Sequence, residues 1–226
     1  MVNTVMAWVI ASVSLAGVAS ADVILTFNWG QSSVEVLPGA TIAVPLYLTE
    51  TLTGNSASIL LFENGVSSVG VSVTRQASML PTSPAFLTLG GLSINTIDFF
   101  DSSDVIFGPE LAVSPSGNLA QMLMFARDEG VVGSPLSASI RRVLLGTITF
   151  RAGAVAGETT VFTSGDYVLT SSDTVTWRNF QVLDGQIAGS TLSITTIIPA
   201  PTSAAGLLIA GLLATRRRRY SRAWSN

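Results

Sequence analysis

Short runs of alternating apolar and polar residues fill the chain between Asp22 and Ile198, and Gly, Pro, Ser and Asn separate these runs. In one run the apolar residues at every second position are Ile42, Val44, Leu46 and Leu48. Period-two alternation indicates a strand that buries one face, and no window sustains a helical period beyond one or two turns. Residues 22–196 are therefore predicted to form one all-β domain, a two-sheet β-sandwich.

Three of these runs predict particular places in a sheet. Pro45 lies inside the run over residues 41–48, and a Pro within a strand predicts an edge strand or a bulge. In the run over residues 69–74, Val alternates with Gly, Ser and Thr, which predicts a half-buried strand with a polar outer face. Residues 120–126 are apolar on both faces, as expected of a central strand.

The remaining runs complete the predicted set of strands. In the run over residues 144–151 we expect Ile148 and Phe150 to point inward and Thr147, Thr149 and Arg151 outward. Four later runs lie at residues 159–163, 167–170, 174–177 and 191–195. Asp184-Gly185 between two apolar residues predicts the tight turn of a hairpin. Residues 77–89 are predicted to hold a short helix.

Two segments of the body resemble cohesin-like jelly-roll domains. Residues 34–48 (Val-Glu-Val-Leu-Pro-Gly-Ala-Thr-Ile-Ala-Val-Pro-Leu-Tyr-Leu) look like the opening of such a domain, where a Pro-Gly turn leads into a Val-Pro-bearing strand. Residues 145–150 (Leu-Gly-Thr-Ile-Thr-Phe) look like its late core strand. The resemblance implies a cohesin-like jelly roll for the body, and dockerin binding is not carried over with it.

The composition excludes several chemistries from the body. The sequence contains no Cys and no His, and all 11 basic residues are Arg, which excludes disulfides, a thiolate, an imidazole and a Schiff-base lysine. All 14 carboxylates lie between Asp22 and Asp184 with only six Arg, so the body has a net charge of 6 − 14 = −8. This acidic charge disfavours nucleic-acid binding. No motif marks a catalytic pair of carboxylates, so we predict no catalytic residue and no enzymatic activity.

The densest group of carboxylates consists of Asp98, Asp101 and Asp104. Oxygen ligands at this density are candidates for a Ca²⁺ site, although their spacing is not that of an EF-hand. The alternative is a solvated acidic loop without a cofactor.

Two indoles of the body are candidates for a ligand-binding surface. Trp29 or Trp177 would serve as a stacking platform for a sugar if exposed beside an acidic groove. The alternative is burial in the core, where a sandwich commonly holds a Trp, and burial of both would favour a structural or adhesive role.

Residues 1–21 have the outline of a secretory signal peptide. An apolar run over residues 5–16 is too short to span a bilayer and leads to Ala19-Ser20-Ala21. Small residues at Ala19 and Ala21 suit signal peptidase, and Asp22 would then be the mature N-terminus. The alternative is a buried first strand.

Residues 197–226 form a different kind of segment. Pro199, Ala200 and Pro201 precede an apolar stretch over residues 202–215, and a basic cluster follows, made of Arg216, Arg217, Arg218 and Arg219. A helix over the apolar stretch would span about 21 Å at ~1.5 Å per residue, against a hydrocarbon core of about 30 Å. We therefore predict a short transmembrane helix whose Arg cluster holds the C-terminus on the cytoplasmic side.

The Pro motif, short apolar helix and Arg cluster, in this order, resemble the PEP-CTERM protein-sorting signal of Gram-negative bacteria. In that family a Pro-Glu-Pro motif precedes the helix and an exosortase-type membrane protease processes the segment, whereas here Ala200 replaces the Glu. The resemblance implies export and an association with extracellular polysaccharide. It also implies that signal peptidase and an exosortase-type protease are partners.

The resulting expectation is an exported, non-enzymatic cell-surface or extracellular-matrix protein that passes through the inner membrane, transiently or permanently. The alternative is a carbohydrate- or calcium-dependent binding module that its C-terminal helix anchors permanently. A nucleic-acid patch at residues 216–219 is disfavoured, because such a patch has no reason to follow an apolar helix.

Overall fold

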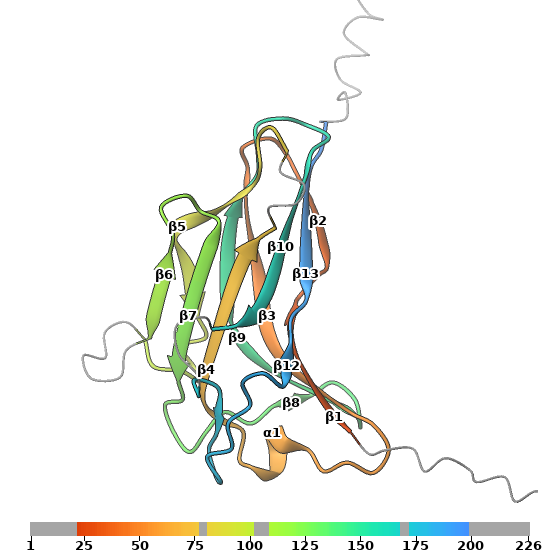
Figure 1. Ribbon diagram of the computed structural model, residues 1–226, viewed down its shortest axis with the longest axis vertical. Coiled ribbons are helices and arrows are strands. Elements are labelled where there is room, and N and C mark those ends of the chain that lie inside the picture. The colour runs from red at the N-terminus through yellow and green to blue at the C-terminus, as the bar shows by residue number, and fades with distance from the viewer. Residues whose placement is uncertain (1–21, 77–80, 102–108, 168–171, 199–226) are drawn as a thin grey trace, which may run out of the picture.

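The computed structural model describes residues 22–76, 81–101, 109–167 and 172–198, and these residues form two packed β-sheets with one short helix (Figure 1). The elements of this described part are β1 (Val23–Trp29), β2 (Ser33–Val36), β3 (Thr41–Leu52), α1 (Ile59–Phe62), β4 (Val66–Arg75), β5 (Phe86–Ile94), β6 (Glu110–Val113), β7 (Leu119–Phe125), β8 (Ser134–Pro135), β9 (Ile140–Arg151), β10 (Thr159–Asp166), β11 (Val175–Thr176), β12 (Ile187–Ala188) and β13 (Thr191–Thr196). The all-β sandwich predicted from the alternation is confirmed.

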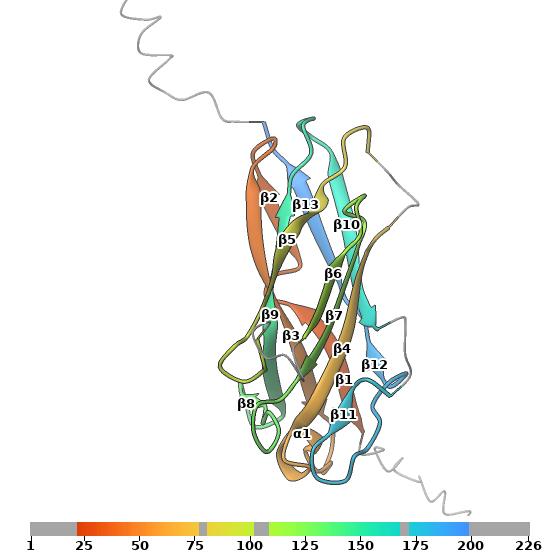
Figure 2. The ribbon, with the colours of Figure 1, turned by 90° about the vertical axis from the view of Figure 1, so that its left-hand side faces the viewer.

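The strands of the described part divide into two sheets (Figure 2). The first has the order β12-β1-β3-β9-β5, with β8 also paired to β9. The second has the order β2-β13-β10-β4-β7-β6, with β11 also paired to β4. The β1–β12 and β2–β13 pairs are parallel, whereas the long neighbours within each sheet pair antiparallel.

The core lies between the inner faces of the two sheets. Phe150 of β9 packs against Phe162 of β10 with ring centroids 4.7 Å apart, which ties one sheet to the other. Ile148 and Phe150 are fully buried while Thr147, Thr149 and Arg151 keep solvent exposure, as their alternation predicts. Val44, Leu46 and Leu48 of β3 are fully buried on the same inner face. Burial of such side chains, at about 1.5–3 kcal/mol each, is the main stabilising contribution.

β3 is an interior strand, so the prediction of an edge strand at Pro45 is wrong. β3 pairs with β1 on one side and β9 on the other. β1 ends at Trp29 opposite Leu46, and the N–H of Gly30 donates to the carbonyl of Pro45 at 2.8 Å. In an antiparallel strand the N–H and C=O of one residue face the same neighbouring strand. The nitrogen of Pro45, which carries no hydrogen, therefore faces the side of β1, just beyond the last residue of β1. The predicted bulge is present beside it, between Leu46 and Tyr47 in the β9 ladder.

The outer face of β4 is covered, which contradicts the predicted polar, solvent-facing surface. Gly70 and Ser72 are buried, and the segment that follows β10 lies over Gly70. The Gly70 N–H donates to Oγ1 of Thr174 at 3.1 Å, and a Cβ at Gly70 would come within 2.3 Å of Asp173 and 2.8 Å of Tyr167. Only a residue without a side chain fits at position 70, because the segment that follows β10 crosses the sheet at this point.

Other sequence predictions are corrected by the strand order. β7 has β4 and β6 as neighbours, as expected of a strand inside the sheet, but its outward side chains are only half-buried. Residues 86–89 of the predicted helix belong to β5, and residues 77–80 lie outside the described part.

Asp184-Gly185 does form a tight turn, since the Gln186 N–H donates to the Leu183 carbonyl at 3.0 Å. The strand after this turn is β12, which joins β1 of the other sheet in parallel, so no hairpin forms. In the run over residues 167–170, Tyr167 follows the end of β10 and residues 168–170 lie outside the description.

The predicted signal peptide (residues 1–21) and the segment from Pro199 to Asn226 lie outside the described residues. Among the residues that are described, no helix has the length and apolar character needed to cross a membrane. β13 finishes at one end of the sandwich, whereas α1 and β11 lie at the other (Figures 1 and 2). β3 connects these two ends over 12 residues, a distance of roughly 40 Å at ~3.3 Å per residue.

Candidate functional site

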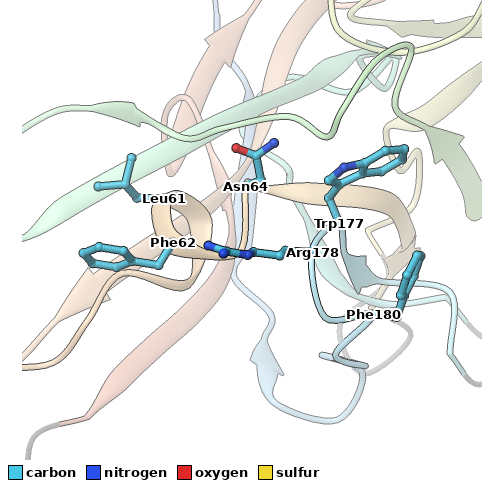
Figure 3. A pocket seen from close by; sticks show the side chains of 6 residues that line it. All are labelled: Leu61, Phe62, Asn64, Trp177, Arg178 and Phe180. Carbon is cyan, nitrogen blue, oxygen red and sulfur yellow. The ribbon is translucent and has the colours of Figure 1, made fainter.

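Several large aromatic side chains are exposed together at the end of the sandwich that carries α1 and β11 (Figure 3). Phe180 is 70% exposed, Phe62 is 59% exposed and Trp177 is 37% exposed. Burial of side chains of this size is normally favourable, so their grouping on a surface is a candidate interaction site. We call the hollow that they line the aromatic groove; its lining residues are Leu61, Phe62, Asn64, Trp177, Arg178 and Phe180.

α1 forms one wall of the aromatic groove, and a buried carboxylate holds it in place. Glu50 of β3 is fully buried on the inner face of its sheet. Its side chain accepts hydrogen bonds from the backbone N–H of Ile59 at 2.6 Å, the backbone N–H of Leu60 at 3.2 Å and the hydroxyl of Ser58. Ser58 also caps the helix by accepting from Leu61 N–H. These donors offset the cost of burying the charge, while Leu60 enters the core and leaves Leu61 and Phe62 outside.

A tight loop over residues 177–180 forms the other wall. The N–H of Thr176 donates to the carbonyl of Gln181 at 3.0 Å, and the N–H of Gln181 donates to Oγ1 of Thr176 at 2.9 Å. This closure brings the backbone of Phe180 into the left-handed region at φ 53°, which is costly for a bulky residue. The loop therefore presents Trp177 and Phe180 on a constrained backbone.

The two walls are joined through the backbone that follows α1. Trp177 N–H donates to the Gly65 carbonyl at 3.0 Å, and Arg178 N–H donates to the Glu63 carbonyl at 2.9 Å. Gly130 packs into the same junction with φ 94°, and a Cβ there would lie 2.4 Å from the Asn64 carbonyl and 2.7 Å from the Trp177 side chain. Only a Gly fits this close approach without displacing a neighbour. Chain segments around residues 64, 130 and 177 thus build a single site.

The aromatic groove has a volume of about 620 Å³. A second hollow of about 520 Å³ shares Trp177 and Phe180 with it and extends toward Phe100, Phe125 and Arg127. Both volumes fall in the ~300–1,000 Å³ range of small-molecule sites. The side chains of Trp177 and Phe180 therefore line both hollows.

Arg178 supplies a positive charge to the groove. Figure 3 shows its side chain extending from the loop, with its nitrogens on the side of Phe62. Within the described residues, its guanidinium makes no hydrogen bond, ion pair or ring contact, whereas the other five Arg of the body each have one. Those contacts are Arg75 to the Ala85 carbonyl, Arg127 to Asp101, Arg141 to the Gly133 carbonyl, Arg142 over the Tyr47 ring and Arg151 to the Gly39 carbonyl.

The structure separates the two candidate indoles. Trp29 is 8% exposed, stacks edge-on against Phe150 with centroids 5.8 Å apart, and donates from Nε1 to the Ser190 carbonyl at 3.3 Å. It is a core residue and no platform for a ligand. Trp177 lies in the wall of the aromatic groove, in the position expected of a stacking platform. In the aromatic groove its polar neighbours are Asn64 and Arg178, so this groove is basic rather than acidic, whereas the second hollow that Trp177 lines contains both Arg127 and Asp128.

The predicted calcium ligands take part in other contacts. Asp98 accepts a hydrogen bond from the Asn95 side-chain amide at 2.6 Å, and Asp101 pairs with Arg127 at 3.5 Å. Asp104 lies outside the described residues. Among the residues that the structure does describe, no three His, Cys, Asp or Glu side chains are grouped so that they could hold a metal ion.

The cleavage residues Ala19 and Ala21 and the sorting motif lie outside the described residues, so they remain predictions. The residues of the sorting motif are Pro199, Ala200, Pro201, Arg216, Arg217, Arg218 and Arg219.

Sequence reasoning missed α1, Arg178 and Phe180. The Asn64-Gly65 pair is a turn signal that could have placed a sharp reversal after the apolar residues Ile59–Phe62. No local signal links this turn to residues 177–180, because the connection is made by tertiary hydrogen bonds.

No family model matches this chain, and a search of curated proteins finds no relative. Among solved structures, a type II cohesin–X-dockerin complex from Acetivibrio cellulolyticus includes a similar chain with a TM-score of 0.40 and 12% identity, over 78% of this chain and 97% of that one. A second type II cohesin module, from a cellulosomal adaptor scaffoldin of the same organism, has a TM-score of 0.37 and 11% identity, over 81% and 99% of the two chains.

A third solved structure is AvmM, which catalyses macrocyclization in alchivemycin A biosynthesis. It has a TM-score of 0.27 and 11% identity, over 81% of this chain and 90% of that one. At these scores the likenesses assign neither a partner nor an activity to this protein.

Proposed function

We propose that this protein is an exported, non-enzymatic binding module, displayed at the cell surface and binding its ligand through the aromatic groove. The observation that carries the proposal is the place of the groove in the fold. α1 and β11 lie at one end of the sandwich, and β13 finishes at the other, from which the chain continues toward the predicted sorting segment (Figures 1 and 2). If residues after Ile198 are held at a membrane, the aromatic groove points away from it.

The boundaries of the fold support the proposed division of the chain. β1 begins at Val23, just after the predicted cleavage site at Ala21, and the N–H of Asp22 already donates to Oγ1 of Thr53 at 2.9 Å. β13 ends at Thr196, immediately before the segment that resembles a PEP-CTERM signal. The folded domain therefore fits between the two segments that we propose are processed or inserted.

Intact-mass analysis of the protein taken from its host surface tests the sorting part of the proposal. The expected mass lacks residues 1–21 and everything after about Pro201. A mass that retains the Arg cluster would support the alternative of a permanent anchor, and a mass that still includes Met1 would contradict export. Replacing Arg216, Arg217, Arg218 and Arg219 with Gln should abolish normal sorting, and unchanged sorting would contradict the role of the cluster.

Retention of the purified protein on extracellular matrix from the host tests the binding part. Trp177→Ala should reduce retention, because it removes a wall that both hollows share. Leu89→Ala is the matched control, since Leu89 is also an exposed apolar residue, 67% exposed, but lies on β5. Equal retention of the two variants would contradict a binding role for the aromatic groove.

A further inference from the structure

We infer that the aromatic groove binds an extracellular glycan with widely spaced acidic sugars, in which Arg178 contacts the acid group and Trp177 and Phe180 contact the sugar rings. This inference rests on the proposed function and names the ligand class of the same groove. It is carried by three properties of the site: a cation with no partner among the described residues, flat apolar surfaces, and the charge of the surrounding domain.

Arg178 is the first property. The body has few cations, and each of its other Arg side chains already has a described contact. Arg178 instead lines the groove, where its planar guanidinium can donate two parallel hydrogen bonds to one carboxylate. A carboxylate of the ligand would pair with the Arg178 guanidinium, which has no partner in the described part of the chain.

The aromatic side chains are the second property. One face of a pyranose ring is made of C–H groups and its rim of hydroxyls, so it packs flat on an aromatic ring while its rim needs polar partners. Trp177 and Phe180 are exposed on a constrained loop, with Asn64 beside them. The amide nitrogen of Asn64 donates to the Glu129 carbonyl at 2.8 Å, and its side-chain oxygen, which has no partner among the described residues, is left to accept a hydrogen bond from a hydroxyl of the ligand.

The charge of the domain is the third property, and it limits how acidic the ligand can be. The body has a net charge of 6 − 14 = −8, so a dense polyanion is repelled at long range. A single carboxylate at Arg178, followed by neutral sugars in the second hollow, satisfies the local cation without this repulsion. The geometry therefore fits a repeat with one acidic sugar among several neutral ones.

Calorimetric titration of the mature protein from its host tests the inference. The probe is a set of deacylated gellan oligosaccharides, in which one glucuronate occurs in each tetrasaccharide repeat, and the matched control is the same material after its carboxyl groups are reduced to alcohols. We expect the acidic probe to bind and the reduced probe to bind about tenfold more weakly, which is the range of a charged hydrogen bond.

Two variants separate the role of Arg178 from a general effect of charge. Arg178→Gln should weaken binding of the acidic probe about tenfold and leave that of the reduced probe unchanged. Arg142→Gln removes the same charge from the outside of β9, where Arg142 lies over Tyr47, and should change neither affinity by more than about twofold. Trp177→Ala should weaken the binding of both probes, because stacking of a sugar ring on the indole does not depend on the acid group.

Three results would overturn the inference. The first is equal affinity for the two probes with no effect of Arg178→Gln. The second is no binding of either probe while Trp177→Ala still reduces matrix retention, which would leave the proposed function standing with a different ligand. The third is a dimer in light scattering that Phe180→Ala dissociates, which would assign the groove to a second copy of the chain.

Discussion

The side chain of Tyr167 covers part of the outer face of the sheet that contains β4. It is 6% exposed, and its hydroxyl donates to Glu110 of β6 at 2.8 Å, so it links the chain after β10 to the far edge of the sheet. Burial, the hydrogen bond to Glu110 and the nearby charges of Glu110 and Asp173 raise the pKa of Tyr167 to about 12.

The pKa of Tyr167 predicts a pH dependence of stability. Its folded value of about 12 lies above the ordinary value of 10.0, so folding favours the neutral phenol. The contribution is complete below pH ~10 and is lost as the pH rises to about 12. Absorbance titration near 295 nm should show one late-ionising tyrosine that Tyr167→Phe removes and Tyr47→Phe retains. A late step that survives Tyr167→Phe would contradict this assignment.

The close packing around Gly130 predicts that a side chain at this position lowers the stability of the fold. Gly130→Ala should destabilise the fold by about 1–3 kcal/mol and shift the fluorescence of Trp177, because the added Cβ has no space beside Asn64 and Trp177. Gly157→Ala is the control, since Gly157 has a similar φ of 87° but no atom within 4 Å of the new Cβ. Urea unfolding measures both changes. Equal losses would show that backbone strain alone, and no close contact, explains the effect.

At the scale of elements, α1 is a helix of four residues that depends on its surroundings. An isolated helix of this length is unstable in water, because nucleation is unfavourable. The hydrogen bonds of Glu50 and Ser58 and the burial of Leu60 stabilise α1 instead of further helical turns. Sequence periodicity could not predict it, since the carboxylate that holds the first turn of α1 lies in β3, and no local pattern links Glu50 to residues 58–60.

Glu50→Ala should therefore destabilise the protein by about 1–3 kcal/mol, because it leaves the N–H groups of Ile59 and Leu60 without their acceptor. The same variant should weaken ligand binding, since α1 forms a wall of the aromatic groove. Glu35→Ala on the exposed side of β2 is the control and should cost less than about 0.5 kcal/mol. Urea unfolding that finds the two variants equally stable would contradict the role of Glu50.

At the scale of the whole molecule, we propose different roles for the two ends of the sandwich. β13 finishes at one end, before the predicted membrane segment, and α1, whose residues line the aromatic groove, lies at the other end (Figure 1). β1 lies inside its sheet between β12 and β3, and its inward side chains Leu25, Phe27 and Trp29 are buried. The first strand after the predicted cleavage site is thus an integral part of the core.

This arrangement predicts which truncations the fold tolerates. A chain of residues 22–198 should unfold cooperatively with the same thermal midpoint as the longer chain, because all the strands that the structure describes lie within it. Further removal of residues 22–30 should abolish cooperative unfolding, since β3 and β12 would both lose their neighbour. Circular dichroism melting curves check both outcomes. A much lower midpoint for residues 22–198 would show that the terminal segments contribute to the fold.

The sequence by itself determined the two-sheet sandwich, the inward faces of β3 and β9, and the exclusion of thiol, imidazole and lysine chemistry. These follow from side-chain alternation and composition, which are local properties of the chain. Only the tertiary structure decided that β3 is interior, that β4 is covered on both faces, that Trp29 is buried while Trp177 is exposed, and that residues near 62 and 178 share a groove. The reason is physical: strand order and surface covering depend on hydrogen bonds and packing between segments far apart in the chain, and no local pattern records which segments will meet.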